Sequence, residues 1–350
     1  MANAQNDAPI RIGVLGAGGL GKAAARIVGL KRELQLNVIC DSRGIVSAPG
    51  GLDCGAVASL SGDLVHGYRQ AAEGGSASGA VAVATEAEAR HCDDPIQAVI
   101  DRAAELDGIV VALPNLPNEF IPDVVARFAR AGTPLVFVDV LKRTRAVQAM
   151  FAREAVIRQA RSVVMTGCGA TPGMLAAAAV LAAQSFVEVE KVDIWWGVGI
   201  ANWEAYRATI REDIAHLPGY SVERAKAMSD QDVDELLART NGLLELRHME
   251  HADDVLLQRV GVVDDPAQVE VGGVMDTRHP KKPVSTTMTL TGITHDGRRS
   301  SHKFILGDET TMAANVIGPA LGYLKRGLWL RERGLYGVFG STEFLPMVVR

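Results

Sequence analysis

Hydrophobic positions in the first 166 residues follow two alternating patterns. Short continuous apolar runs are separated by longer segments in which apolar residues recur every three or four positions. Continuous runs predict strands buried on both faces, and the spaced pattern predicts helices that cover them, so we expect a parallel sheet between two helical layers. The predicted strands are residues 10–15, 37–40, 108–113, 135–140 and 162–166, with a less distinct one at 80–85, and the predicted helices are residues 22–34, 95–106, 118–131 and 146–160.

The pattern changes after Gly173. Residues 173–187 form the longest apolar stretch, which is too short for a membrane span of about 20 residues and predicts a buried helix. Strands that follow one another without helices predict an antiparallel or mixed sheet. In this part we expect strands at 189–197, 256–263, 269–274, 284–291 and 300–306, helices at 203–217, 222–227 and 230–240, and a last helix at 311–331.

A glycine-rich turn follows the first predicted strand and precedes the first helix, and Asp41 ends the second strand. This arrangement is typical of a dinucleotide-binding unit, in which glycines permit a tight turn, close approach of the pyrophosphate and close helix packing. A strand-end aspartate accepts hydrogen bonds from the ribose and favours NAD, whereas Arg43 can pair with the phosphate of NADP. We therefore expect NAD, with NADP as the alternative, held by Gly16, Gly18, Gly19, Leu20, Gly21, Asp41, Ser42 and Arg43.

These patterns together predict the α/β fold class. We expect a Rossmann doubly wound parallel sheet at residues 8–170 and a mixed α/β substrate and dimerisation domain at residues 171–310. Residues 311–350 are predicted to form a C-terminal helix and strand that pack back on the first domain. The active site is expected in the cleft between the two domains.

Polar residues after later strands are candidates for chemistry, because open α/β sheets bind ligands at the carboxyl ends of their strands. The segment Leu113, Pro114 and Asn115 is expected near the nicotinamide, with a plain turn capped by Asn118 as the alternative. Asp139 and Lys142 are the predicted catalytic pair. The lysine can donate a proton or bind a carboxylate, or belong to a solvated basic turn.

Three further segments complete the candidates. Thr171 is predicted to cap a helix that starts at Pro172 and to contact the nicotinamide or an anionic substrate, and Cys168 is interpreted as packing rather than as a nucleophile. Trp203, Arg207 and Arg211 share one helical face and are predicted to bind substrate, unless this is an ordinary amphipathic helix. His302 is a weaker acid–base candidate. His248 and His251 lie three residues apart without a third ligand, so we expect no metal.

Part of the chain resembles the saccharopine dehydrogenase and L-lysine dehydrogenase group. The resemblance rests on the glycine turn 16–21, on Asp41, and above all on residues 166–173, Thr-Gly-Cys-Gly-Ala-Thr-Pro-Gly, before an alanine-rich helix. It covers residues 1–43, 108–200 and 308–350 and implies NAD(P)-dependent hydride transfer at an amine or imine carbon of an amino-acid-like substrate. Asp41-Ser-Arg-Gly44 and Gly51-Leu-Asp53 are instead similar to glutamate and homoserine dehydrogenases. The position of Lys142 is similar to that of the catalytic lysine of homoserine dehydrogenase.

Two alternatives therefore stay open beside this interpretation. One is a carbonyl reductase similar to homoserine dehydrogenase, and the other is a regulatory protein that binds NAD(P)(H) without turnover. The absence of a sharp acid–base motif in residues 201–306 keeps the second of these open.

Composition restricts the partners. The formal net charge is −5 and there is no block of basic residues, which argues against nucleic acid and anionic membranes as partners. Residues 1–9 contain no basic segment followed by an apolar one, and the four cysteines are scattered, so we expect no secretory signal and a cytoplasmic protein with reduced thiols. A small-molecule substrate and a homodimer or homotetramer complete the expectation.

Overall fold

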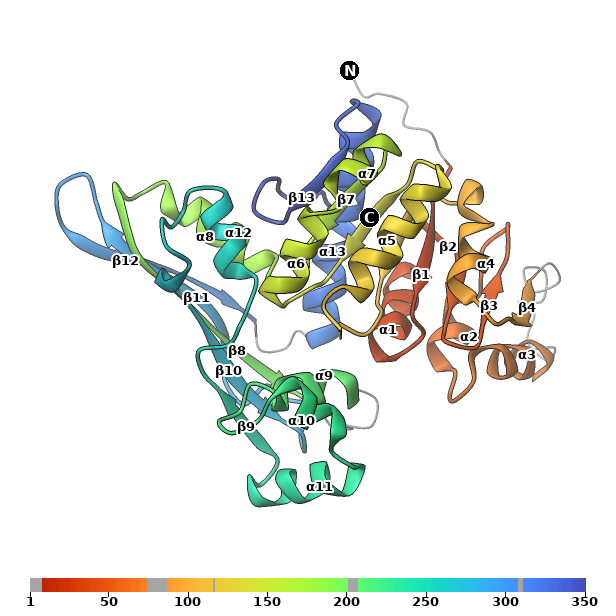
Figure 1. Cartoon of the computed structure of the whole chain (residues 1–350), viewed down its shortest axis with the longest axis horizontal. Helices are drawn as coiled ribbons and strands as arrows, with labels where there is room; N and C mark the ends of the chain where they lie inside the picture. The colour runs from red at the N-terminus through yellow and green to blue at the C-terminus, as the bar shows by residue number, and fades with distance from the viewer. Residues whose placement is uncertain (1–7, 75–86, 116, 201–206, 308–310) are drawn as a thin grey trace.

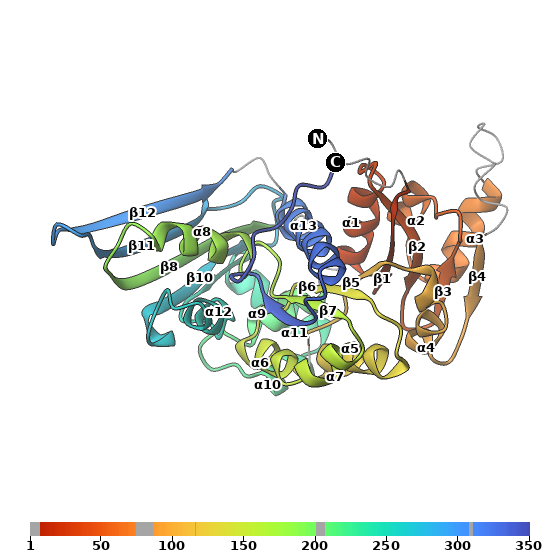
Figure 2. The same ribbon diagram turned by 90° about the horizontal axis from the view of Figure 1, so that it is seen from above.

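The computed structural model of the chain describes residues 8–74, 87–115, 117–200, 207–307 and 311–350. Two sheets lie toward opposite ends of the molecule, with helices around and between them (Figure 1). The same separation is visible from above in Figure 2. This confirms the predicted fold class, an α/β chain with a large, mostly parallel sheet and a second, mixed sheet.

The first sheet has the strand order β13-β7-β6-β5-β1-β2-β3-β4. All pairs from β13 to β2 are parallel, and β3 and β4 add an antiparallel edge. Its strands are β1 (Ile10–Leu15), β2 (Leu34–Cys40), β3 (Gly44–Ser47), β4 (Glu88–His91), β5 (Gly108–Val111), β6 (Val136–Asp139), β7 (Val163–Thr166) and β13 (Gly337–Gly340).

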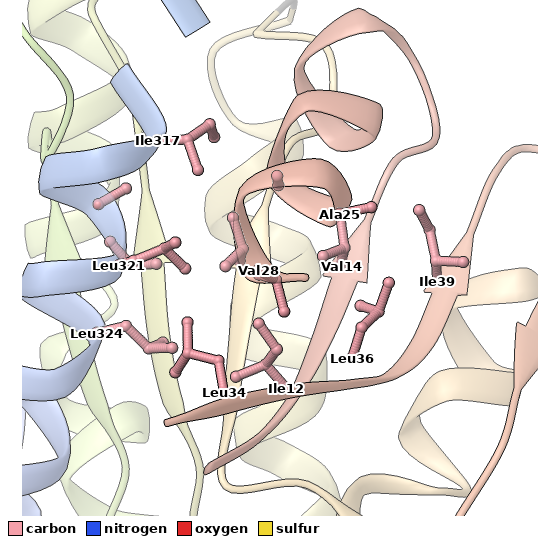
Figure 3. Packing of buried hydrophobic residues seen from close by; sticks show 14 of the residues in the cluster. Ile12, Val14, Ala25, Val28, Leu34, Leu36, Ile39, Ile317, Leu321 and Leu324 are labelled. Carbon is pink, nitrogen blue, oxygen red and sulfur yellow. The ribbon is translucent and has the colours of Figure 1, made fainter. Parts of the chain in front are cut away.

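Helices cover both faces of this sheet, as continuous apolar strands require. One face packs against α1 (Gly19–Val28), α2 (Cys54–Ser59), α3 (Leu64–Gly74) and α13 (Met312–Glu332). Figure 3 shows Val28 of α1 and Leu321 and Leu324 of α13 meeting Ile12 and Leu34 of the sheet. The other face packs against α4 (Pro95–Ile100), the short 3-10 helix η3 (Ala103–Glu105), α5 (Phe120–Ala131), α6 (Thr144–Phe151) and α7 (Glu154–Gln159).

The second sheet has the order β12-β11-β8-β10-β9, in which β10 and β8 are parallel and the other pairs antiparallel. Its strands are β8 (Glu188–Gly199), β9 (Leu243–Leu246), β10 (Val269–Asp276), β11 (Thr286–Ile293) and β12 (Arg299–Leu306). Its core includes residues of α8 (Met174–Ala183), α9 (Arg207–Ile214), α10 (Val222–Ala227), α11 (Asp230–Arg239) and α12 (Asp253–Arg259), and the 3-10 helix η5 (Pro266–Gln268) precedes β10.

Several predicted elements are wrong in kind or in bounds. Residues 256–263 were expected as a strand, but residues up to Arg259 belong to α12. Leu256 of this helix packs in the core of the first sheet, and Leu257 packs in the core of the second sheet. An element buried on two sides shows a continuous apolar run without being a strand. Residues 146–160 belong to two helices rather than one, and the strand expected at 80–85 falls outside the described residues.

The helix after Gly173 also differs from the expectation. It starts at Met174 with Gly173 at its N-cap, so Thr171 does not cap it and Pro172 is not its first residue. It is buried on one side only, because Leu181 keeps 60% of its surface exposed. Among the described helices, none is long and apolar enough to cross a membrane.

The glycine turn requires the absence of a side chain at two positions. Gly16 has a φ of +102°, and a Cβ on Gly21 would lie 1.8 Å from the carbonyl oxygen of Gly16. Gly21→Ala should therefore lower the unfolding free energy by about 2 kcal/mol, because backbone atoms must move to make room. Gly18→Ala is the matched control, since a Cβ there meets nothing within 4 Å and should cost less than about 1 kcal/mol. Urea unfolding of both variants measures the difference, and equal losses would contradict this account.

Candidate active site

A cavity of about 790 Å³ lies between the two sheets. The segments after β1, β5, β6 and β7 form one wall, and β8, β10, β11 and α9 contribute the other. Its volume falls within the range of small-molecule sites, about 300–1,000 Å³. A second hollow, of about 430 Å³ and lined by residues 28–36 and 50–54, brings together fewer polar side chains, so we take the larger cavity as the candidate site.

Lys142 is the centre of a polar cluster in which it meets Glu212 and Asp213 from the opposite wall of the cavity. Its Nζ lies 2.6 Å from Asp213 Oδ1 and 3.5 Å from Glu212 Oε2, and both carboxylates are nearly buried at the end of α9. Burial opposes the charge on Lys142, but the two carboxylates outweigh it, so the pKa of the ammonium is raised. The group is therefore a protonated amine between two acids at neutral pH.

Glu212 has one further property that matters for a ligand. Its Oε2 accepts a hydrogen bond from Asn115 Nδ2 at 3.3 Å, whereas Oε1 is buried and has no hydrogen-bond partner in the described part of the chain. Buried acceptors are normally paired, so an unpaired carboxylate oxygen on a cavity-lining side chain is a place for a donor from outside the protein.

Asp139 lies beneath the cavity surface and does not line it. The carboxyl is fully buried, and its Oδ1 accepts hydrogen bonds from the amides of Leu141 and Gly167 and from Thr166 Oγ1. The carboxyl thereby holds the end of β6 against the end of β7 and fixes the loop that carries Lys142. Its Oδ2 has no partner among the described residues, and Asp139 does not line the cavity.

Burial raises the pKa of the Asp139 carboxyl to about 6, against its three hydrogen bonds. Because the folded-state pKa lies above the unfolded one, the stability associated with this group is present at acid pH and is lost as the pH rises through about 6. Asp139→Asn keeps an acceptor oxygen and removes the titration. The unfolding free energy of the wild type should fall relative to this variant by about 2 kcal/mol between pH 4 and pH 7. Urea unfolding at both pH values measures this, and a constant difference would contradict it.

Most residues expected at the site do line the cavity: Gly16, Gly18, Gly19, Leu20, Asp41, Ser42, Leu113, Pro114, Asn115, Lys142, Thr171 and Arg211. Some of their polar groups are already engaged. The Asp41 carboxylate accepts hydrogen bonds from the amides of Arg43, Gly44 and Leu64 and so shapes its own loop. The Arg211 guanidinium binds the carbonyl oxygens of Ala225 and Met228 and the Asp230 carboxylate.

Other expected residues lie elsewhere. Gly21 and Arg43 are not among the lining residues, and Arg43 pairs with Asp63 at 3.6 Å. His302 is on the exposed strand β12, where its ring packs against Phe186 away from the cavity lining. Trp203 and the side chain of Arg207 fall outside the described residues. Asn118 does not cap α5, whose N-cap is Glu119, and its Oδ1 accepts a hydrogen bond from Arg143 instead.

The cavity-lining residues that were not predicted as site residues include Glu212, Asp213 and His251. Glu212 and Asp213 sit beside Arg211, which was singled out, but two adjacent acids on a charged helix give no signal by themselves. His251 was considered only as a metal ligand.

No protein-family model matches the chain. A curated protein of Haloferax mediterranei, the (S)-8-amino-7-oxononanoate synthase BioU, is 42% identical over 350 residues, covering 96% of this chain and 99% of that protein. Among solved structures, an engineered D-amino acid dehydrogenase bound to NADP+ has a TM-score of 0.53 at 15% identity, covering 96% of this chain and 94% of that one. The DAP dehydrogenase of C. glutamicum in complex with DAP has a TM-score of 0.53 at 17% identity, covering 95% and 93%. At these identities the two structures show the fold alone.

The expected saccharopine or lysine dehydrogenase family is therefore wrong. The relative at 42% identity is named as a synthase, which overturns the predicted hydride transfer and the alternative similar to homoserine dehydrogenase. A regulatory protein is disfavoured too, because the relative is an enzyme. The assignment of NAD, or NADP, is withdrawn with the dehydrogenase function on which it rested, and the NADP+ in the distant structure is a property of that protein. A glycine turn and a strand-end acid report the local backbone shape, which many chemistries share.

Proposed function

This chain belongs to the family of the (S)-8-amino-7-oxononanoate synthase BioU, and we propose that it forms (S)-8-amino-7-oxononanoate in the cavity that holds Lys142. The observation that carries the proposal is the identity of 42% over 96% of this chain and 99% of the relative. The chemistry of the cavity supports it independently, because each part of the named product finds a complementary wall.

The amino group of this product fits the acidic side chains of the polar cluster. Glu212 and Asp213 supply two negative charges against the one positive charge of Lys142, so the cluster is net negative and favours an added ammonium. Glu212 Oε1 is the unpaired acceptor at which that ammonium can donate a hydrogen bond. The C7 ketone beside the amine would then lie within reach of Lys142.

The hydrocarbon part of the product fits the apolar side chains that line the rest of the cavity. Cavity lining outside the polar cluster is predominantly apolar, and the glycine turn offers backbone N–H groups that suit an anionic group such as a carboxylate. The apolar side chains that line the cavity include Leu20, Ile96, Leu113, Phe120, Val140, Trp196, Val198, Met249, Met275, Leu306 and Val316.

Lys142 is proposed as the catalytic residue, because it is the charged amine that the loop after β6 presents to the cavity. Its ammonium can give a proton to oxygen or nitrogen at the reacting carbon and take it back. Asp139 is proposed as a positioning residue, since its hydrogen bond to the Leu141 amide fixes the same loop without reaching the cavity.

Formation of the product by the purified protein tests this proposal. The protein is added to a small-molecule extract of cells, and (S)-8-amino-7-oxononanoate is quantified by chiral chromatography with mass spectrometry. Product should rise in proportion to the protein and carry the S configuration. No rise in either enantiomer in an extract to which authentic product can be added and recovered would contradict the proposal.

Three further expectations stay proposals. The chain is proposed to act in the cytoplasm on a small amino-acid-like molecule, to divide at about residues 170 and 310, and to assemble as a homodimer or homotetramer. The outer strand β12 exposes Phe304 and Ile305 along a sheet edge, which is consistent with assembly. Light scattering of the purified protein measures its mass.

A further inference from the structure

An asparagine in the first turns of α13 lines the cavity without a partner. Asn315 is only 8% exposed, and its side-chain amide forms no hydrogen bond with another residue in the described part of the chain. The other asparagine of the cavity lining, Asn115, donates to Glu212. Buried polar groups are normally paired, so the partner of the Asn315 amide is expected to come from the molecule that the cavity binds.

Packing places Asn315 close to the loop that carries Lys142. Helix α13 packs beside α1 (Figure 1), and Val316 follows Asn315 on it. A Cβ built on Gly169 would lie 3.5 Å from Val316 Cγ1 and 3.7 Å from Val140 Cβ, so these side chains are neighbours. Val140 precedes Lys142 by two residues, and all five residues line the cavity. Asn315 and Lys142 therefore border one stretch of it.

Helix N-termini make this stretch of the cavity favourable for a negative group. Helices α1, α8 and α13 all begin here, because residues within three positions of each helix start line the cavity. None of the three has an acidic residue in its first turn, so the partial positive charge of each N-terminus is not neutralised locally. The acids that hold Lys142, Glu212 and Asp213, belong to α9 instead.

The length of the named product matches this separation of charges. Its amine and ketone are proposed to lie at Glu212 and Lys142, and its carboxylate is six carbon–carbon bonds from the ketone, about 7 Å in an extended chain. A chain that leaves Lys142 along the apolar side chains of Val140 and Val316 brings its carboxylate to Asn315. The ammonium and the carboxylate of one ligand thereby reach groups that suit each of them.

We propose that Asn315 determines specificity for the carboxylate of the substrate and product, to which its Nδ2 donates a hydrogen bond. The inference rests on the proposed function, because that function supplies a ligand with an amine near one end and a carboxylate at the other. No bond is made or broken at Asn315, so it is a binding residue and not a catalytic one. The chemical class it selects is a medium-length carbon chain that ends in a carboxylate.

Isothermal titration calorimetry with authentic (S)-8-amino-7-oxononanoate at pH 8 tests this assignment. Asn315→Asp keeps the shape of the side chain and places a like charge beside the ligand carboxylate, so the Kd should rise by about 10²-fold. Asn315→Leu removes the donor without adding charge and should raise the Kd by about 10-fold. Ala314→Asp is the matched control, because it adds the same charge at an exposed residue that does not line the cavity. Its Kd should stay within about twofold of the wild type.

A neutral ligand shows whether the carboxylate is the group that Asn315 binds. The C1 carboxamide of the product has the same shape and no negative charge at this end. Wild type and Asn315→Asp should bind it with Kd values within about threefold of each other, because the repulsion is absent. An equal loss of affinity for acid and carboxamide would overturn the inference, as would unchanged binding of the acid by the folded variants. Circular dichroism confirms folding, and Asn315→Leu replaces Asn315→Asp in the comparison if the latter does not fold.

Failure of the proposed function gives a different result. If the wild type does not bind the authentic product, that function is wrong, and nonanoate, which has the chain and carboxylate without the amine and ketone, becomes the probe. Binding of nonanoate that is lost in Asn315→Asp and kept in Ala314→Asp would support the assignment of Asn315. No binding of nonanoate by the wild type, or equal binding by all three proteins, would overturn it.

Discussion

Lys142→Arg should lower the rate of (S)-8-amino-7-oxononanoate formation by about 10³-fold while the protein stays folded. Arginine keeps the positive charge between Asp213 and Glu212, so the buried acids stay compensated. Its guanidinium does not release a proton near neutral pH, and a proton donor at this position is therefore lost. The rate is measured by the chiral product assay, with urea unfolding as the check on stability.

Lys191 provides a matched control, because its Nζ also bridges two carboxylates, Asp193 at 2.6 Å and Glu270 at 2.7 Å, on the exposed side of the second sheet. Lys191→Arg should leave the rate within about twofold of the wild type. If Lys142→Arg kept the wild-type rate, the lysine would act only as a charge that binds a carboxylate, and its proposed catalytic role would be wrong.

Asp213→Asn should lower the unfolding free energy by about 4 kcal/mol, because it leaves the Lys142 ammonium nearly buried without its closest partner. The carboxylates raise the pKa of Lys142 against the effect of burial. A cation whose folded-state pKa is raised contributes stability that is present below its ordinary pKa, about 10.4, and is lost as the pH rises above it. The loss should therefore be the same from pH 6 to pH 9, as measured by urea unfolding.

A double-mutant cycle separates this pair from other effects of the substitution. Lys142→Met combined with Asp213→Asn removes both charges, so the double variant should be more stable than the sum of the single losses indicates. Additive losses would show that the 2.6 Å contact contributes nothing, and the proposed polar cluster would need to be revised.

The larger sheet was predictable because its strands are short, apolar and separated by amphipathic helices, as in the run from Gly108 to Thr166. Residues 44–92 gave no clear pattern, since β3 and β4 have only four residues each and the edge strand β4 carries mostly charged side chains. The helix α12 was mistaken for a strand because Leu256 and Leu257 pack on two different cores. The spacing of apolar residues along the sequence cannot show that a helix packs against two cores, because this depends on the tertiary structure.

The sequence predicted the site residues that directly follow a strand of the parallel sheet. It missed the site residues that come from segments distant in the sequence. Lys142 and Asn115 follow strands of the parallel sheet, and the rule for strand ends places them at the cavity. Glu212 and His251 reach the same cavity from α9 and from the segment before α12, and nothing in their own neighbourhoods marks them. The chemistry itself was misjudged, because the glycine turn indicates a backbone shape and not the reaction performed beside it.

A crystal structure of the protein with authentic (S)-8-amino-7-oxononanoate tests the central claim most directly. The account predicts the product in the cavity between the two sheets, with its amine within hydrogen-bond distance of Glu212 Oε1 and its ketone near Lys142 Nζ. Product bound elsewhere, or a cavity that stays empty when the crystals are saturated with the compound, would contradict it.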